Sequence, residues 1–167
     1  MIFAAETQAR FDREIAKYPP EQRQSAVMAC LAIVQQEQGH ISLESEQAVA
    51  EYLGMTHIAV HEVATFYNMY NLQPVGKYKL ALCTNLSCQL QGAMQALKAL
   101  EQKLGITLGE TTADGLFTLQ QCECAGACAD APVLLVNDRH MCSHMTQQRL
   151  EELVDGIQAE EGGGGQA

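Results

Sequence analysis

The sequence has little positive charge. It contains 10 lysines and arginines against 20 aspartates and glutamates, which gives a formal net charge of -10. Because no cluster of lysines and arginines is present to neutralise phosphates, the composition argues against binding to nucleic acid. The acidic balance instead favours basic surfaces on other protein subunits as partners.

Long hydrophobic runs are also missing. The longest runs over residues 26–34, about half the length that a membrane-spanning helix requires. Five charged residues interrupt any apolar segment of a signal peptide: Glu6, Arg10, Asp12, Arg13 and Glu14. We therefore expect a chain that is not exported and does not insert directly into the membrane.

Nucleotide-binding motifs are absent as well. The sequence has no G-x-G-x-x-G fingerprint, no phosphate-binding loop and no internal repeat. It also has no C-x-x-C pair, which a thioredoxin-type thiol enzyme needs. We expect that the chain alone binds neither NADH nor FMN.

Cysteines, in contrast, are frequent, and five of the seven lie in two loops. The first loop is Cys83-x₄-Cys88, and the second holds Cys122, Cys124 and Cys128. Thiolates presented in pairs suit zinc or an iron-sulfur cluster. The wide first loop and the small residues of the second favour a cluster, because backbone N-H groups can then approach its sulfides. Structural zinc and thiol chemistry on the same fold remain open alternatives.

Four motifs together resemble a known family. They are Cys83-x₄-Cys88, Cys124-A-G-A-Cys128-A-D-A-P, V-A-T-F-Y at 63–67 and Q-P-V-G-K-Y at 73–78. In this order they resemble the thioredoxin-like 2Fe-2S subunit of NADH:quinone oxidoreductase, respiratory complex I, over residues 23–158. The resemblance implies one 2Fe-2S cluster on Cys83, Cys88, Cys124 and Cys128. It also implies that a partner flavoprotein subunit binds FMN and NADH, in a peripheral arm on the cytoplasmic side of the inner membrane.

Three alternative functions remain at this point. Close relatives in that family are small subunits of NAD-dependent formate dehydrogenases and hydrogenases. A free-standing thioredoxin-like ferredoxin is an alternative of a different class. In each case, no catalytic activity is expected from the isolated chain, since outer-sphere electron transfer breaks no substrate bond.

Several other residues have the chemistry of ligands. Cys122 replaces a residue that is usually aliphatic in the family, so it is either a packing thiol or a substitute ligand. His57 and His61 have the i, i+4 spacing of a metal pair, but a solvated helix face is the simpler interpretation. We expect Cys30 to be a buried thiol, and the run of His140, Cys142 and His144 to be structural or exposed.

The first half of the chain predicts a helical arm, residues 1–75. A polar lead-in of about 22 residues ends at Pro19-Pro20. Three helices follow, over 22–39, from a Ser42 cap to Leu53, and from a Thr56 cap to about Tyr67. We expect Phe66, Tyr67 and Tyr70 in the core, and the 63–67 segment as packing between the arm and a second domain.

The second half predicts an α+β domain, residues 76–158, followed by a disordered tail over 159–167. Strands are expected over 77–82, 116–121, 133–136 and 139–142, the last two joined by a tight Asn137-Asp138 turn. One long helix carries Leu90, Met94, Leu97 and Leu104, and a final helix is marked by Leu150, Val154 and Ile157. This β-α-β-β-α order, together with the resemblance, indicates a thioredoxin-like fold of the α/β class.

Overall fold

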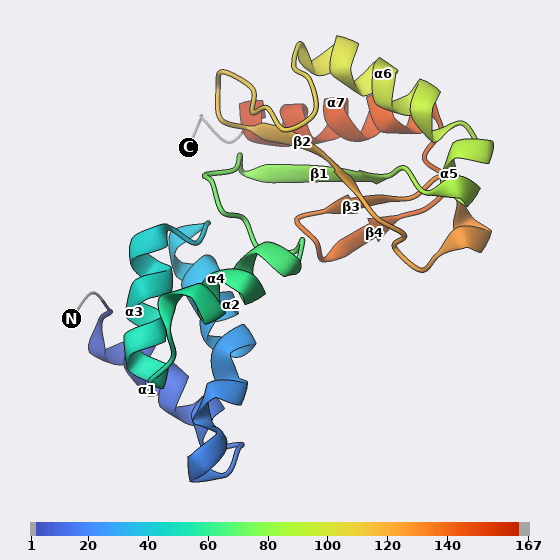
Figure 1. Cartoon of the computed structure of the whole chain (residues 1–167). Coiled ribbons are helices and arrows are strands. Elements are labelled where there is room, and N and C mark those ends of the chain that lie inside the picture. Colours follow the sequence, from blue (N-terminus) through green and yellow to red (C-terminus); the bar gives the residue numbers. More distant parts are fainter. Residues whose placement is uncertain (1–2, 164–167) are drawn as a thin grey trace. The chain divides into compact units, whose positions relative to one another are not determined.

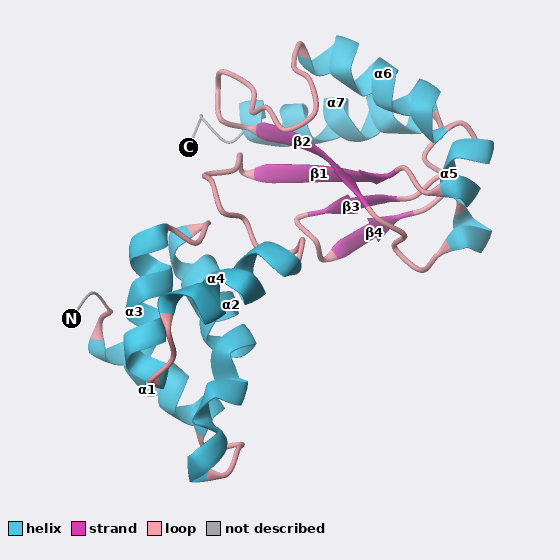
Figure 2. Cartoon of the chain, in the orientation of Figure 1, coloured by secondary structure: helices cyan, strands magenta, loops and turns pink. Residues whose placement is uncertain are grey.

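The computed structural model describes residues 3–163, and the chain divides into two compact units (Figure 1). The first unit, Met1–Pro74, contains helices, and the second, Val75–Ala167, combines helices with a sheet (Figure 2). Each unit has its own cluster of buried apolar side chains. Within residues 3–163, no helix is long and apolar enough to cross a membrane.

The first unit contains the three predicted helices, now α2 (Val27–Gln38), α3 (Leu43–Leu53) and α4 (His57–Phe66). Their predicted N-caps are confirmed: Ser42 Oγ accepts from Ser45 N at 3.1 Å, and Thr56 Oγ1 accepts from Ala59 N at 3.4 Å. Helix α2 begins later than expected, because Pro20–Ala26 form a 3₁₀ segment, η1. Cys30 lies fully buried in α2, and burial raises the pKa of its thiol to about 12.

The lead-in forms a further helix, α1 (Ala5–Ile15), which the sequence pattern did not predict as a packed element. Phe11 of α1 is fully buried, and its ring lies 5.1 Å from that of Phe3 and 5.3 Å from that of Tyr52. Edge-on aromatic contacts of this kind supply large apolar burial from one side chain. Phe11 therefore supplies the buried apolar contact of α1, and polar contacts of α1 with Glu37 and Tyr52 add to it.

The aromatic residues at the end of α4 differ from the prediction. Tyr70 is buried as expected, and its hydroxyl donates to the Met28 carbonyl oxygen at 2.8 Å. Phe66 and Tyr67, however, are exposed, so their predicted core positions are wrong. The helix ends at Phe66, and the extended backbone of Tyr67 (φ -93°, ψ 108°) takes it off the buried face of α4. The proposed packing role of the 63–67 segment stays a prediction.

The second unit has the predicted β-α-β-β-α order, extended by short helical segments. Its sheet has the order β2-β1-β3-β4, in which β1 and β2 are parallel and the other neighbours antiparallel. Helices α6 and α7 lie along the same face of this sheet (Figure 1). The elements are β1 (Tyr78–Cys83), α5 (Leu86–Leu90), α6 (Ala93–Leu104), β2 (Phe117–Cys122), η2 (Cys128–Asp130), β3 (Leu134–Val136), β4 (His140–Cys142) and α7 (Gln147–Gly163).

The core of this unit follows from strand alternation. Leu80 and Leu82 of β1 are fully buried beside Phe117 and Leu119 of β2. Side chains at i and i+2 share one face of a strand, so these four make a continuous apolar surface. The helices complete it with Ala96, Leu97, Leu100, Leu150, Val154 and Ile157.

The predicted long helix is interrupted. Gly92 adopts a left-handed conformation (φ 91°), which ends α5 and starts α6 separately. Because α5 and α6 have different axes, Leu90 does not continue the apolar stripe of α6, and both Leu90 and Met94 are exposed. Cys88 lies in the first turn of α5, close to the predicted helix N-terminus.

The hairpin between β3 and β4 has the predicted tight turn. Asn137 and Asp138 both have positive φ, 53° and 55°, as a two-residue type I′ turn requires. Asn137 Oδ1 accepts from Lys79 N at 2.7 Å, and Asp138 forms an ion pair with the buried Lys79 ammonium. These contacts fix the turn to β1.

The C-terminal segment differs from the disordered tail expected over 159–167. Helix α7 continues to Gly163, and residues 164–167 lie outside the described part. Glu161 accepts hydrogen bonds from Lys77 Nζ at 2.6 Å and from the Tyr78 hydroxyl at 2.9 Å. Two donors at the start of β1 thus hold the last turn of the helix, despite the glycines that follow.

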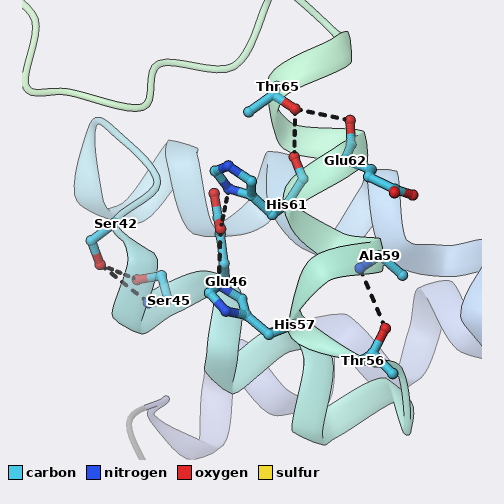
Figure 3. A network of polar contacts seen from close by, with 9 residues as sticks. All are labelled: Ser42, Ser45, Glu46, Thr56, His57, Ala59, His61, Glu62 and Thr65. Carbon is cyan, nitrogen blue, oxygen red and sulfur yellow. Dashed lines mark hydrogen bonds and ion pairs between the residues drawn. The ribbon is translucent and has the colours of Figure 1, made fainter.

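A buried carboxylate links α3 and α4 in the first unit (Figure 3). Glu46 is 1% exposed, and its Oε2 lies 3.1 Å from His57 Nε2 and 2.9 Å from His61 Nδ1. Either facing ring nitrogen can donate a hydrogen bond to this carboxyl oxygen. The pair is exposed to solvent as expected, with side chains 39% and 38% exposed, but the two imidazoles also cover the buried Glu46 carboxyl group.

We predict that replacing both His57 and His61 by alanine destabilises the helical unit by about 1–3 kcal/mol, because the buried carboxylate loses two donors. Adding Glu46→Leu to that double variant should recover part of the loss, since no buried anion then remains. Urea unfolding measures the effect.

The matched control is His40→Ala, because that ring lies 3.3 Å from the Gln38 carbonyl oxygen and no carboxylate contact involves it in the described structure. A destabilisation that persists undiminished in the triple variant would contradict the assigned role of the carboxylate.

Candidate metal centre

The two cysteine loops follow neighbouring parallel strands. Cys83 is the last residue of β1, Cys122 is the last residue of β2, and the two are paired in the strand register. The carboxyl ends of parallel strands lie at one edge of a sheet, so the loops that leave them start side by side. This edge therefore collects the cysteines of both loops.

Cys83 and Cys88 form a buried pair at this edge. Burial, the largest single influence on Cys83, raises its pKa, but the backbone N-H groups of Asn85 and Ala125 and the Cys88 thiol outweigh it. The net effect lowers the pKa of Cys83. The N-H of Ala125 comes from the second loop, so this small-residue loop brings a backbone donor to the Cys83 sulfur. The expected approach of such donors to cluster sulfides stays a prediction.

Cys88 behaves in the opposite way. Burial, and then the hydrogen bond that its thiol donates to Cys83, raise the pKa of Cys88, although the Val133 N-H acts against them. The sequence predicts a helix N-terminus at or just after Cys88, which would lower the pKa of its thiol. The structure shows the opposite direction, so this prediction is wrong. The two neighbouring thiols thus have pKa values shifted in opposite directions, Cys83 lowered and Cys88 raised.

Cys124 and Cys128 form an exposed pair in the second loop. Their Sγ atoms lie 3.6 Å apart. Two sulfurs that share one tetrahedral metal at a bond length of about 2.3 Å are about 3.8 Å apart. The separation therefore suits two ligands of one metal ion.

The two pairs together offer four thiols, Cys83 with Cys88 and Cys124 with Cys128, in loops that leave neighbouring strands. Within residues 3–163, no group of three or more His, Cys, Asp or Glu side chains is already gathered around one point. A 2Fe-2S cluster needs only two thiolates at each iron. One buried and one exposed pair at the same sheet edge satisfy that requirement.

Cys122 is held apart from these pairs. It is half-buried, and its Sγ donates to the Ala81 carbonyl oxygen at 3.6 Å. Burial, followed by the nearby Cys83, raises the pKa of Cys122 to about 11. These contacts favour the packing role over that of a ligand.

The alternating run after the hairpin turn is dispersed. Cys142 packs against the core, and burial raises the pKa of its thiol. His140 is exposed, while His144 Nε2 lies 3.7 Å from Asp130 Oδ1. The three side chains thus have different surroundings, as a structural and surface interpretation predicts.

Asn85 is a site residue that sequence reasoning missed. Its side-chain oxygen accepts from Leu86 N at 3.1 Å at the start of α5, and its Nδ2 donates to Glu123 Oε2 at 3.2 Å. It also supplies one of the N-H donors to Cys83. An asparagine next to an expected helix start was the available signal.

Comparisons with known proteins agree with this geometry. The family described as Thioredoxin-like [2Fe-2S] ferredoxin matches residues 11–158. NADH-quinone oxidoreductase subunit 2 of Thermus thermophilus is 44% identical over 159 residues, covering 95% of this chain and 88% of the relative. A further relative, an NADH-quinone oxidoreductase subunit of Rhizobium meliloti, is 43% identical over 146 residues, covering 87% of this chain and 85% of the relative.

The fold also occurs in a crystal structure of NAD⁺-reducing [NiFe]-hydrogenase in the air-oxidized state. The TM-score is 0.69 at 21% identity, over 81% of this chain. The match spans 23% of that longer chain, and at this identity it shows the fold alone. The family match over residues 11–158 and the relatives at 43–44% identity show more than the fold. The chain belongs to the thioredoxin-like [2Fe-2S] ferredoxin family.

Proposed function

We propose that this chain is the electron-transfer subunit of an NADH:quinone oxidoreductase, respiratory complex I, and carries one 2Fe-2S cluster. The observation that carries the proposal is the convergence of two cysteine pairs at one sheet edge. Relatives at 44% and 43% identity that have the names of such subunits support it.

The four cysteines that would hold the cluster are Cys83, Cys88, Cys124 and Cys128. When bound, the cluster supplies storage for one electron at a time. The N-H groups of Asn85 and Ala125 stabilise negative charge on the Cys83 sulfur, which favours the reduced state. Nearby Glu123 acts in the opposite direction and raises the pKa of Cys83.

The hydride chemistry belongs to a partner. A one-electron carrier cannot accept the electron pair of NADH, and this sequence has no dinucleotide fingerprint. A flavoprotein subunit with FMN therefore oxidises NADH and passes on single electrons, on the cytoplasmic side of the inner membrane. In this division, residues 76–158 carry the cluster and the helical residues 1–75 help to dock the chain.

The alternatives fit less well. A free ferredoxin needs no helical arm, yet the family match includes residues 11–74 as well as the cluster domain. The small subunit of an NAD-dependent formate dehydrogenase or hydrogenase would use the same residues. Identities of 41–44% to NADH-quinone oxidoreductase subunits favour the quinone-linked enzyme.

We predict that the purified chain is red-brown and binds about two irons and two acid-labile sulfides per chain, with no stoichiometric zinc. Reduction should produce a paramagnetic signal that integrates to one electron. Metal analysis together with paramagnetic resonance tests this, and one tight zinc without labile sulfide would refute it.

We predict that Cys124→Ala loses most of the bound iron, because it removes one of two thiolates at one iron. Cys122→Ala is the matched control, since it removes a thiol two residues away that donates to the Ala81 carbonyl oxygen instead. It should retain the wild-type absorption and resonance spectra. Loss of the cluster in Cys122→Ala with retention in Cys124→Ala would reverse the assignment.

We predict that NADH does not reduce the isolated chain, but reduces its cluster once the FMN-loaded flavoprotein subunit of the same organism is added. Stopped-flow bleaching of the cluster absorption measures the reaction. Flavoprotein without FMN is the control, because electron transfer requires the flavin to divide the pair. Reduction of the isolated chain by NADH would be incompatible with the proposal.

A further inference from the structure

Helix α5 presents opposite chemistry on its two sides. Cys88 points inward and is 2% exposed. Leu86 and Leu90, four residues apart in the same helix, are 68% and 78% exposed. Residues with that spacing lie on one helix face, so two large apolar side chains stand together in solvent directly behind a buried cysteine.

This apolar face adjoins the second cysteine loop. Asn85, the N-cap of α5, donates from Nδ2 to Glu123 Oε2 at 3.2 Å. Glu123 immediately precedes Cys124, which is exposed together with Cys128. The leucine face and the exposed cysteine pair therefore belong to neighbouring parts of one surface.

The same surface is bordered by negative charge. Residues 83–92 and 122–132 contain no lysine or arginine, whereas Glu123 and Asp130 are present and exposed. An apolar centre with a charged rim is the anatomy of a protein interface, and exposed large apolar side chains gathered at a functional site mark such surfaces.

We propose that Leu86 and Leu90 form the apolar centre of the surface that docks the flavoprotein partner. The partner surface has an apolar patch for the leucines and lysines or arginines facing Glu123 and Asp130. This inference rests on the proposed function: electrons that pass through the exposed cysteine pair require a redox partner on that side, and the leucines exclude water from the contact. The acidic rim steers association.

The test compares Leu86→Glu and Leu90→Glu with Met141→Glu in the full chain. Met141 is also a large exposed apolar residue, 50% exposed, but lies on the edge strand β4. We expect each leucine variant to weaken binding to the FMN-loaded flavoprotein about tenfold or more, equivalent to about 1.4 kcal/mol, while Met141→Glu stays within about twofold. Calorimetry gives the dissociation constant.

Two further measurements separate docking from damage to the cluster. Iron content and resonance spectra of the leucine variants should match the wild type, because neither side chain is a proposed ligand. The association rate of the wild type should fall as salt is raised, since the rim charges become screened.

Wild-type affinity in both leucine variants would overturn the proposal, as would an equal loss in Met141→Glu. A surface that joins two copies of this chain would appear as a wild-type dimer that Leu86→Glu dissociates, with flavoprotein binding unchanged, and would also overturn it. Failure of the proposed function is distinguishable, because then the wild-type chain itself accepts no electrons from NADH through the flavoprotein.

Discussion

Parallel pairing of β1 and β2 is the constraint on which the site depends. Their register sets Cys83 beside Cys122, and from there the two loops start at one sheet edge. A slip of one residue would move Leu80 and Leu82 off the core face, so burial of these leucines fixes the register. Packing of the core therefore also determines that Cys83 and Cys122 lie side by side at the ends of their strands. The parallel crossover through α6 is what brings residues about 40 positions apart to this edge.

The two cysteine pairs differ in how strongly the protein prepares them. Cys83 and Cys88 are held by burial and by a shared hydrogen bond, whereas Cys124 and Cys128 lie on an exposed loop beside Gly126, which has a left-handed φ of 77°. A buried pair provides a rigid side for a metal group, and a loop with a glycine can close around its other side. Of the two pairs, only Cys124 and Cys128 are exposed to solvent.

Local sequence signals predicted much of this structure. The caps at Ser42 and Thr56 and the Asn137-Asp138 turn each depend on side chains that bond to nearby backbone, so a short window suffices. Contacts between distant residues escaped prediction. Phe11 attaches α1 through Tyr52, about 40 residues away, and Glu46 meets His57 and His61 only because α3 and α4 pack. The resemblance had already singled out four of the five loop cysteines, and the hydrogen bond from Cys122 to the Ala81 carbonyl oxygen supports leaving Cys122 out.

The failed predictions fall into two physically different groups. Around Phe11 and Glu46 the sequence pattern gave no sign of burial, and the structure shows contacts with distant residues that stabilise the helical unit. At Phe66 and Leu90 the sequence predicted core positions, and the structure leaves large apolar side chains in solvent. Exposure of such side chains costs free energy that folding alone does not recover. Sequences retain such a cost where function requires it, and the docking surface proposed above supplies such a function for Leu90. The exposure of Leu90, where the sequence predicts a core position, is therefore a stronger indication of a binding surface than a buried leucine would be.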